Sequence, residues 1–386
     1  MDTFVDILLY RIITPFGLCA YLTIVGSLLA LTMEFNVGWT LTAIIITISF
    51  SFAYEFLINS NSTATPPDAC TYNKSKIRFM RQRQIPMVIL NELTPYDNGY
   101  AFGTMYRSAI RRVIPKLALF NFDLKPAEDY MIPADYMAEI QGMSDATDVP
   151  VDLFIQAHTM AERNGACTTI ATESVFGRNL DWIPLDLAQE TVVVVFKQQG
   201  LFVLTLPGLL CGPTMWTNTT IGAVNVSPEH IVLDENGTSM LFHFRHLMET
   251  SYTCEDVKEF SVNNKPHSPY HVTFKGPDGA ISVEHSSGIH VLQTAETDYC
   301  LLTLNYDHAG NSRFNSYYRD DLLSEELHNN GQPSTVRAMQ HWLRLVQTWI
   351  TCHTVVATKT NVFLAYGNGY SASKQRYIQM PRWLRC

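Results

Sequence analysis

One stretch of the chain, Asn164-Gly-Ala-Cys-Thr-Thr-Ile-Ala-Thr-Glu-Ser-Val-Phe-Gly-Arg-Asn-Leu-Asp-Trp182, carries its strongest structural signal. β-branched residues fill the first half, a polar Thr-Glu-Ser turn follows, and a second β-rich run ends in Gly-Arg-Asn-Leu-Asp. These features predict a hairpin with Thr172-Glu173 at its tip. That register pairs Cys167 with Arg178, with Cβ atoms ~4.5–5.5 Å apart on one face. A guanidinium there favours the thiolate, so Cys167 is a candidate nucleophile; a structural cysteine is the alternative.

A nucleophilic cysteine needs a general base, and no histidine lies near Cys167 in the sequence. A peptide break before Cys167 would supply one, because the new α-amine has a pKa of about 7.7–8.0. Asp181, just beyond the hairpin, is placed to hold that cationic group near the sulfur. His308 is the alternative base, although no papain-like signature surrounds it.

The pattern around this hairpin predicts an α+β fold, because strand runs and helices are segregated along the chain. Apolar residues at three- and four-residue spacing predict helices at Tyr106–Leu117, Ala134–Met143, Asp152–Glu162, Ser239–Thr250, Asp256–Phe260 and Thr335–Ile350. β-rich runs predict strands at Ile85–Asn91, Cys167–Thr172, Val175–Leu180, Thr191–Phe196, Leu201–Leu206, Cys300–Asn305 and Val355–Ala365. The polar stretch 56–78 is predicted to be an irregular linker.

The common cofactor and metal motifs are absent from the sequence. It contains no G-x-x-x-x-G-K-[ST], no G-x-G-x-x-G after a strand, no G-x-S-x-G and no H-E-x-x-H. His243 and His246 lie three apart on a predicted helix, but no carboxylate pattern accompanies them and a packed or solvated pair is the simpler interpretation. The eight cysteines are never closer than 34 positions, which excludes a zinc ribbon. We therefore expect neither a metal nor a cofactor.

The composition indicates a membrane segment. Only 16% of the 386 residues are charged, against roughly 25% in an average protein. Ile12–Met33 and Phe35–Tyr54 contain no charge at all, and each is long enough to span a bilayer. The two windows predict a membrane hairpin or signal-anchor; a cleaved signal peptide is the alternative. The formal net charge of −9 argues against a nucleic-acid partner.

The orientation of this segment stays open on these grounds. Lysines and arginines follow the second window and favour a cytosolic remainder, but most lie beyond the ~15–20 residues that count. Five glycosylation sequons favour the opposite orientation. They begin at Asn61, Asn73, Asn218, Asn225 and Asn236.

The Cys167-Thr-Thr-Ile…Gly-Arg-Asn-Leu-Asp181 block resembles the acid ceramidase and N-acylethanolamine acid amidase family, N-terminal-nucleophile hydrolases related to bile-salt hydrolases. Further motifs of that family match in order: Ile85-Pro-Met-Val-Ile-Leu-Asn-Glu-Leu-Thr-Pro-Tyr, Ala138-Glu-Ile-Gln-Gly with Ala146-Thr-Asp-Val-Pro, and Leu304-Asn-Tyr-Asp. The resemblance covers roughly residues 68–366. It implies a four-layer αββα fold with a mainly helical N-terminal chain.

The resemblance also implies roles for individual residues. The Ala166–Cys167 bond would be cut autocatalytically, leaving Cys167 as nucleophile and its α-amine as base. Arg178 would orient the substrate carbonyl, and Asp181 would bind the α-amine. The remaining candidates are Asn305 as oxyanion donor, Arg319 as a second electrostatic partner, Glu229 or Asn225 as the polar residue after a strand, and Trp182 with Asn225 as substrate-binding residues.

Three features depart from the family pattern. The hairpin is about five residues shorter, a membrane segment replaces the usual signal peptide, and the usual partner position of Cys70 lacks a cysteine. Cys352 is the remaining candidate for a disulfide with Cys70. By this resemblance the chain divides into a membrane segment (1–59), a linker and helical α-chain (60–166) and a β-chain with the catalytic core (167–386).

Together these observations predict an amidase that hydrolyses fatty N-acyl lipids of the ceramide or N-acylethanolamine type through a thioester on Cys167. Its α- and β-chains would stay associated after the cut, and its substrate would be a membrane lipid. The resemblance favours a topology in which the catalytic domain is lumenal or extracellular. An acyltransferase using the same thioester and an inactive lipid-binding relative are the alternatives.

Overall fold

The computed structural model describes residues 71–72, 75–79, 85–119, 131–160, 165–182, 185–228, 232–286, 289–295, 298–306, 316–367 and 371–382. All of them belong to the unit Asp68–Cys386. They form mixed α and β structure with two sheets and seven α-helices, which confirms the α+β class. The predicted membrane windows lie outside the described residues. Among the helices that the structure describes, none has the length and apolarity needed to cross a bilayer.

The larger sheet has ten strands in the order β1-β2-β3-β6-β7-β8-β9-β10-β11-β12. Neighbouring strands are antiparallel except for β3 and β6, which are parallel. The strands are β1 (Thr71–Tyr72), β2 (Ser75–Phe79), β3 (Pro86–Leu90), β6 (Val192–Phe196), β7 (Leu201–Thr205), β8 (Thr214–Trp216), β9 (Ile221–Val226), β10 (Tyr270–Gly276), β11 (Gly279–His285) and β12 (Ile289–Ala295). The prediction that residues 56–78 form an irregular linker is wrong for the end of that range, where β1 and most of β2 lie.

The smaller sheet has six antiparallel strands in the order β13-β4-β5-β14-β15-β16. They are β13 (Cys300–Thr303), β4 (Ala166–Thr172), β5 (Phe176–Asp181), β14 (Thr351–Ala357), β15 (Asn361–Tyr366) and β16 (Ile378–Pro381). The predicted single strand over Val355–Ala365 is wrong. The polar residues Thr358–Thr360 form a turn, with the Thr358 amide donating to the Asn361 carbonyl, and this turn separates β14 from β15.

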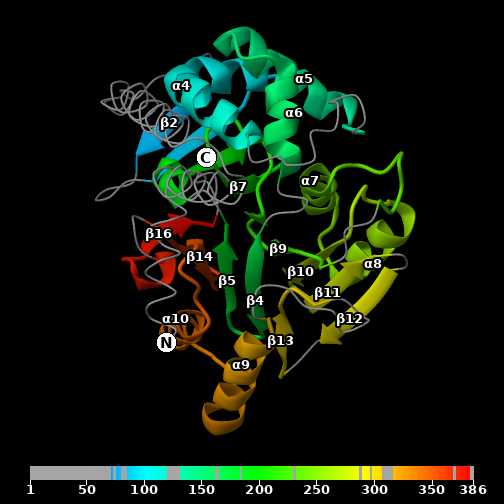
Figure 1. Cartoon of the computed structure of the whole chain (residues 1–386), viewed down its shortest axis with the longest axis vertical. Helices are drawn as coiled ribbons and strands as arrows, with labels where there is room; N and C mark the ends of the chain where they lie inside the picture. Colours follow the sequence, from blue (N-terminus) through cyan, green and yellow to red (C-terminus); the bar gives the residue numbers. More distant parts are fainter. Residues whose placement is uncertain are drawn as a thin grey trace, which may run out of the picture. The chain divides into compact units, whose positions relative to one another are not determined.

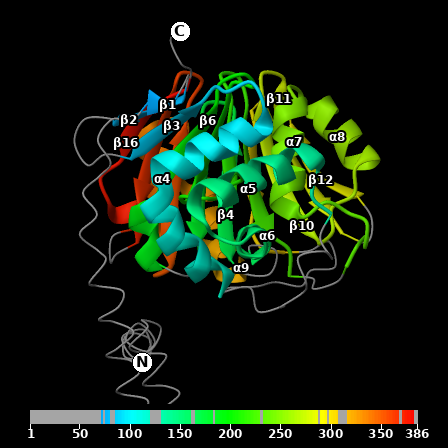
Figure 2. The same ribbon diagram turned by 90° about the horizontal axis from the view of Figure 1, so that it is seen from above.

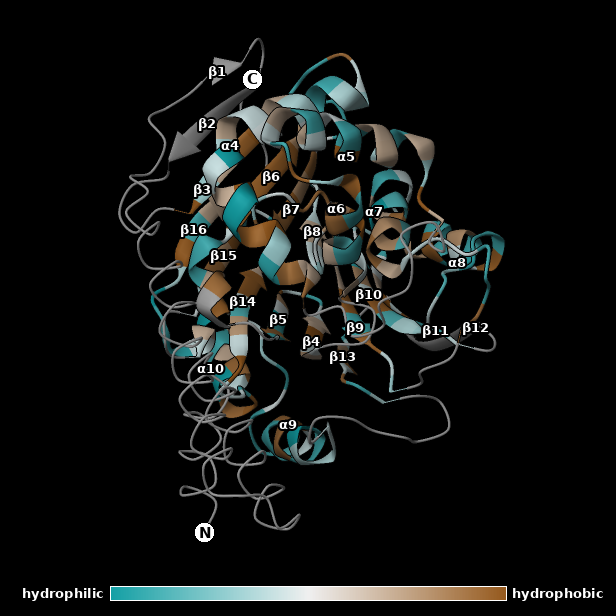
Figure 3. Cartoon of the chain, turned by 45° about the horizontal axis from the view of Figure 1, so that its top comes forward, coloured by the Kyte–Doolittle hydropathy of each residue, from teal (hydrophilic) through white to brown (hydrophobic). Residues whose placement is uncertain are grey.

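Side chains that alternate along a strand pack into two different hydrophobic cores, one on each face of the sheet. Val88 and Leu90 of β3 join the core under the helices, whereas Met87 and Ile89 join the core between the two sheets. This is the period-two alternation expected of strands covered on both faces. Figure 3 shows the central strands β6 and β14 as mainly hydrophobic.

Helices cover the outer face of each sheet. The helices α4 (Pro95–Ala118), α5 (Ala134–Thr147), α6 (Val151–Thr159) and α7 (Met240–Thr250) pack on the larger sheet, and α8 (Cys254–Asn263) follows α7. On the smaller sheet lie α9 (Ser316–Asn330) and α10 (Val336–Leu345). Figures 1 and 2 show this order, with α4–α6 and α9–α10 on opposite sides of the sheets. Short 3₁₀ helices lie at Leu185–Glu190 (η3) and Ala372–Lys374 (η4).

The contact between α4 and α5 depends on small residues. A Cβ added at Gly99 would lie 1.9 Å from the Glu139 carbonyl oxygen, and one at Gly142 would lie 2.2 Å from the Tyr96 carbonyl oxygen. Only glycine allows the two backbones to approach so closely. Thr94 caps α4, because its hydroxyl accepts the Asp97 amide at 3.1 Å.

Candidate active site

Cys167 lies at the start of β4, where the smaller sheet faces the larger one. The register of the hairpin differs from the prediction: Cys167 pairs with Leu180, and Thr169 pairs with Arg178. The tip is Glu173–Ser174, because the Thr172 amide bonds to the Val175 carbonyl. The shift is two residues and so preserves the face of each side chain. Arg178 therefore still reaches the thiol on the diagonal, and its Nη2 donates to Cys167 Sγ at 3.1 Å.

Arg178 is a fully buried cation whose hydrogen-bond partners are all uncharged side chains. Its Nη1 donates to Asn225 Oδ1 at 3.0 Å and to Thr169 Oγ1 at 3.2 Å. In the described part of the chain it forms no ion pair with a carboxylate. A buried charge is normally paired, because its desolvation is costly. Asp181 is close enough for Arg178 to lower the pKa of its carboxyl group, and the Cys167 sulfur is the hydrogen-bond partner of Arg178 that can become an anion.

The thiol itself is 1% exposed. Burial raises the pKa of Cys167 above the ordinary thiol value, while Arg178 and Arg319 act in the opposite direction. Because burial is the larger effect, the two guanidinium groups do not bring the pKa of Cys167 down to the ordinary thiol value. Ionisation at neutral pH requires an additional base close to the sulfur.

Asn305 and Arg319 hold the backbone of Cys167. The Cys167 amide donates to Asn305 Oδ1 at 2.8 Å, and Arg319 Nη1 donates to the Cys167 carbonyl at 2.7 Å. Arg319 Nη2 also donates to Asn305 Oδ1 at 3.1 Å, and Asn305 Nδ2 donates to the Val226 carbonyl at 2.8 Å. Two predicted site residues from distant parts of the chain thus meet at the predicted cleavage point.

Asp181 lies opposite Ala166 across the hairpin. Thr351 donates to its Oδ1 at 2.5 Å, and Arg319 Nη1 lies 3.8 Å from its Oδ2. Oδ2 is buried and accepts no hydrogen bond within the described residues. Burial raises the pKa of Asp181, and Arg319 opposes that effect. A buried carboxylate oxygen that accepts no hydrogen bond among the described residues, beside the first residues of β4, is a candidate to bind an α-ammonium group at Cys167.

Asn225 positions Arg178. Its Oδ1 accepts from Arg178 and, at 2.8 Å, from Thr169 Oγ1. Its Nδ2 donates to the Thr303 carbonyl at 2.8 Å, so both ends of the amide are engaged within the chain. Because this side chain is fully buried, Asn225 is not accessible for glycosylation in the folded protein. Glu229, the alternative candidate, lies outside the described residues.

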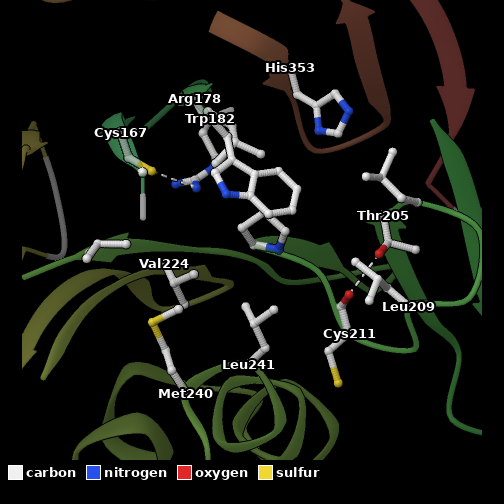
Figure 4. Close-up of a pocket in the computed structure, with 15 residues that line it drawn as sticks. Cys167, Arg178, Trp182, Thr205, Leu209, Cys211, Val224, Met240, Leu241 and His353 are labelled. Atoms are coloured by element: carbon white, nitrogen blue, oxygen red, sulfur yellow. Dashed lines mark hydrogen bonds between the residues drawn. The ribbon is translucent and has the colours of Figure 1, made fainter. Parts of the chain in front are cut away.

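An apolar pocket opens beside the thiol. Its empty volume is about 490 Å³, counting the part open to solvent. The lining residues are Gly165, Cys167, Arg178, Leu180, Trp182, Thr205, Leu206, Leu209, Cys211, Pro213, Val224, Val226, Met240, Leu241 and His353. In Figure 4 the thiol and Arg178 lie at one end, Leu209 and Cys211 at the other, and Trp182 lies between them.

Two lining residues have features that bear on substrate binding and on the cut. Trp182 Nε1 is a buried donor with no partner among the described residues, consistent with the predicted substrate-binding role. Gly165, two residues before Cys167, has a φ of 141°. Only glycine adopts that conformation without strain, so the segment just before the predicted cut requires a glycine.

The remaining predictions concern metals and disulfides. Among the described residues no group of three His, Cys, Asp or Glu side chains is arranged to hold a metal ion. His243 bonds to Tyr270 and Asn264 and is a packed core residue. Cys352 is a buried free thiol that donates to the Leu180 carbonyl at 3.3 Å. Cys70 lies outside the described residues, so the pairing of Cys70 with Cys352 stays a prediction.

Sequence reasoning missed three residues near this site. Thr169 and Thr351 carry hydrogen bonds to the catalytic candidates, and His353 lines the pocket. Thr169 could have been predicted, because it lies two positions after Cys167 on β4 and so points to the same face of the sheet. Nothing in the sequence indicates Thr351 or His353, because they reach the site only through the pairing of β14 with β5.

Comparison of the chain with protein-family models and with curated proteins finds no match.

Proposed function

We propose that this protein hydrolyses the amide bond of fatty N-acyl lipids through a thioester on Cys167. The observation that carries the proposal is Arg178, a buried guanidinium that donates to the Cys167 sulfur and forms no ion pair with a carboxylate among the described residues. Such an arrangement has a cost in stability that a packed apolar residue would avoid. A catalytic role explains why the protein carries this cost: the guanidinium pairs with the Cys167 thiolate during turnover.

Activation begins with cleavage of the Ala166–Cys167 bond. Cys167 Sγ attacks the Ala166 carbonyl carbon, the Cys167 nitrogen leaves and takes up a proton, and water hydrolyses the resulting thioester. The Cys167 amide already donates to Asn305 Oδ1 at 2.8 Å, which holds the leaving nitrogen in place. The product is a β-chain with a free α-amine on Cys167, near Asp181 Oδ2, which accepts no hydrogen bond among the described residues.

Turnover then uses that α-amine as the base. It takes the thiol proton, the thiolate attacks the lipid carbonyl, and the α-ammonium returns the proton to the leaving amine. Water, deprotonated by the same amine, hydrolyses the thioester and releases the fatty acid with regeneration of the thiol. Asn305 has two amide hydrogens, of which the Val226 carbonyl accepts one. The other serves the tetrahedral oxyanion.

The pocket supports an acyl chain as the group bound beside the thiol. Apart from Arg178, Thr205, Trp182 and His353 its side chains are aliphatic or sulfur-containing. Thr205 does not offer its hydroxyl hydrogen to the pocket, because Oγ1 donates to the Cys211 carbonyl at 2.8 Å. Removing an alkyl chain from water into such a site is favourable by about 0.8 kcal/mol per CH₂ group.

The arrangement of helices, two facing sheets and helices supports the four-layer N-terminal-nucleophile hydrolase fold. A buried network supports lasting association of the two chains after the cut. Glu139 of the α-chain pairs with Arg245 of the β-chain, which is 1% exposed and also pairs with Glu249 at 2.8 Å. Separating the chains would expose or unpair these charges.

We further propose that residues 12–54 anchor the protein in a membrane with the catalytic unit on the lumenal or extracellular side. Asn218 and Asn236, at two of the five sequons, are exposed in turns. Treating protein from a secretory host with an amidase that removes N-glycans should lower the mass of the wild type, and by less in Asn218→Gln. Unmodified Asn218 and Asn236 would contradict this orientation.

The experiment that tests the proposed reaction is a panel of ceramide, N-acylethanolamine and other fatty acyl amides across pH. Purified full-length protein should release fatty acid from at least one of them, and Cys167→Ala should abolish release. Cys300→Ala is the matched control, because it removes a free thiol on the neighbouring strand β13. Activity that survives Cys167→Ala would refute the proposal. Acyl transfer to an added amine or alcohol instead of water would identify an acyltransferase.

A further inference from the structure

His353 and His158 are two buried histidines that differ in their hydrogen bonds. His158 uses both ring nitrogens within the chain: Nδ1 bonds to the Phe154 carbonyl, and Nε2 accepts the Leu210 amide at 2.9 Å. His353 is 3% exposed and lines the pocket, and within the described part of the chain only its Nε2 has a hydrogen-bond partner. Its Nδ1 is buried without a hydrogen bond among the described residues.

The hydrogen bonds of Thr191 fix the tautomer of His353. Thr191 donates its hydroxyl hydrogen to the Ala188 carbonyl, so its oxygen is free to accept. His353 Nε2 lies 2.6 Å from that oxygen and therefore carries the ring proton. Nδ1 is left with a lone pair. Burial lowers the pKa of His353 to about 3, and Arg178 acts in the same direction, so the ring is neutral above that value.

His353 and Cys167 lie in one row across the smaller sheet. Leu180 pairs with Cys167 on one side and with His353 on the other, and all three residues line the pocket. Two strand spacings place the Cα atoms of Cys167 and His353 roughly 10 Å apart. Figure 4 shows Arg178 and Trp182 between Cys167 and His353. We expect a lipid bound at the thiol to reach the imidazole within its first several bonds.

From this geometry we infer that His353 Nδ1 accepts a hydrogen bond from a hydroxyl group of the lipid and thereby selects hydroxylated substrates. A site that leaves a buried acceptor unpaired discriminates strongly against a ligand that lacks the donor. An acceptor-only group such as a carboxylate cannot satisfy it. The hydroxyl belongs either to the amine-side headgroup or to the acyl chain. The inference rests on the proposed function, of which it specifies the substrate class.

The test compares lipids that differ only in this hydroxyl. N-palmitoylethanolamine against N-propylpalmitamide probes the headgroup, and the propylamides of 2- and 3-hydroxypalmitic acid against that of palmitic acid probe the acyl chain. Full-length wild-type protein is expected to prefer the hydroxylated member in one arm by about tenfold or more in kcat/KM. The arm that shows the preference identifies the source of the hydroxyl.

Two variants separate recognition from structural damage. His353→Gln keeps an atom at the Nε2 position beside Thr191 and removes the one facing the pocket, so the preference should fall below threefold. Its kcat/KM for the hydroxyl-free amides is measured as well, so that the preference is compared as a ratio within each protein. His353→Asn keeps an acceptor at the Nδ1 position and should retain more of the preference. A wild type without a preference in either arm, or a preference unchanged in His353→Gln, overturns the inference.

Failure of the proposed hydrolysis gives a different result. If no amide is hydrolysed, binding by Cys167→Ala decides the inference, with thermal stabilisation by the same lipid pairs as readout. Stabilisation by the hydroxylated member that disappears when His353→Gln is added supports recognition by His353 without hydrolysis. Equal stabilisation by both members overturns it.

Discussion

Replacing Arg178 with methionine separates catalysis from stability. The guanidinium is fully buried and donates to Cys167 Sγ, Asn225 Oδ1 and Thr169 Oγ1 at 3.0–3.2 Å. A hydrogen bond to a charged group contributes about 1.5–3 kcal/mol. Loss of the bond to the thiolate should lower kcat for amide hydrolysis about 10- to 150-fold, and the rate of the Ala166–Cys167 cut should fall in the same direction.

The same change should not unfold the protein. No carboxylate in the described residues pairs with Arg178, so methionine removes a desolvated charge without leaving an opposite charge unpaired. Replacing buried ionic groups with apolar ones of similar size is often neutral or stabilising by about 1–4 kcal/mol. Arg245→Met is the matched control, because Arg245 is equally buried but pairs with Glu139 and Glu249. Removing one member of such a pair typically costs about 3–5 kcal/mol.

The assay combines kinetics with chemical denaturation of the two purified variants. Arg178→Met is expected to lose activity and keep its unfolding free energy, and Arg245→Met is expected to lose stability. The reasoning is refuted if Arg178→Met retains activity within threefold of wild type. It is equally refuted if Arg178→Met is destabilised as much as Arg245→Met, since Arg178 would then be a structural residue.

Three further predictions concern charge, packing and pH. Asp181→Asn removes the carboxylate that we propose binds the α-ammonium, so kcat/KM of amide hydrolysis should fall about 10- to 150-fold; unchanged steady-state kinetics would contradict this role. Gly99→Ala forces α4 from α5 and should lower the unfolding free energy by about 1–3 kcal/mol. Gly200→Ala is the control, because a Cβ at Gly200 would meet no atom within 4 Å; its unfolding free energy should fall by about 1 kcal/mol, from the positive φ alone. Equal losses of unfolding free energy in the two variants would argue against the packing explanation. Burial lowers the pKa of His243 from 6.5 to about 4, so below pH 6.5 the unfolded chain binds a proton that the folded chain does not. Stability should therefore fall from pH 6.5 to pH 4, by roughly 3 kcal/mol from this residue, and His243→Gln should lack that part; identical pH profiles of the two proteins would exclude it.

The hairpin that carries Cys167 and Arg178 illustrates what sequence could and could not predict. Composition indicated both strands, and the contact between Cys167 and Arg178 was expected. The register was wrong by two residues, because the turn places Glu173 and Ser174 at the tip. An even shift keeps each side chain on its face, so the predicted contact survived as a diagonal one.

Strands with polar inner faces escaped prediction. In β10 the side chains of His271, Thr273 and Lys275 alternate with apolar ones and are buried, so no continuous apolar run marks the strand. Lys275 uses this position to donate to the Thr172 and Glu173 carbonyls at the base of the hairpin turn. Such a lysine resembles an exposed residue in sequence, because its partners come from another sheet.

Site residues that carry no motif and that only long-range strand pairing brings together could not be predicted from the sequence. Asn305 and Arg319 were expected from a family motif, and the structure places both on the Cys167 backbone. Thr351 and His353 carry no motif. They reach the site because β14 pairs with β5, about 170 residues earlier in the chain. Sequence spacing has no information on such a pairing.

The most direct test of the central claim is the intact mass of the purified protein before and after a brief incubation with a lipid amide. Wild type is expected to contain a chain that begins at Cys167, and rapid acid quenching should reveal a fraction heavier by one acyl group. Cys167→Ala should remain a single chain without the adduct. An uncut wild-type chain that hydrolyses lipid amide would contradict the account, as would an acyl adduct on a cysteine other than Cys167.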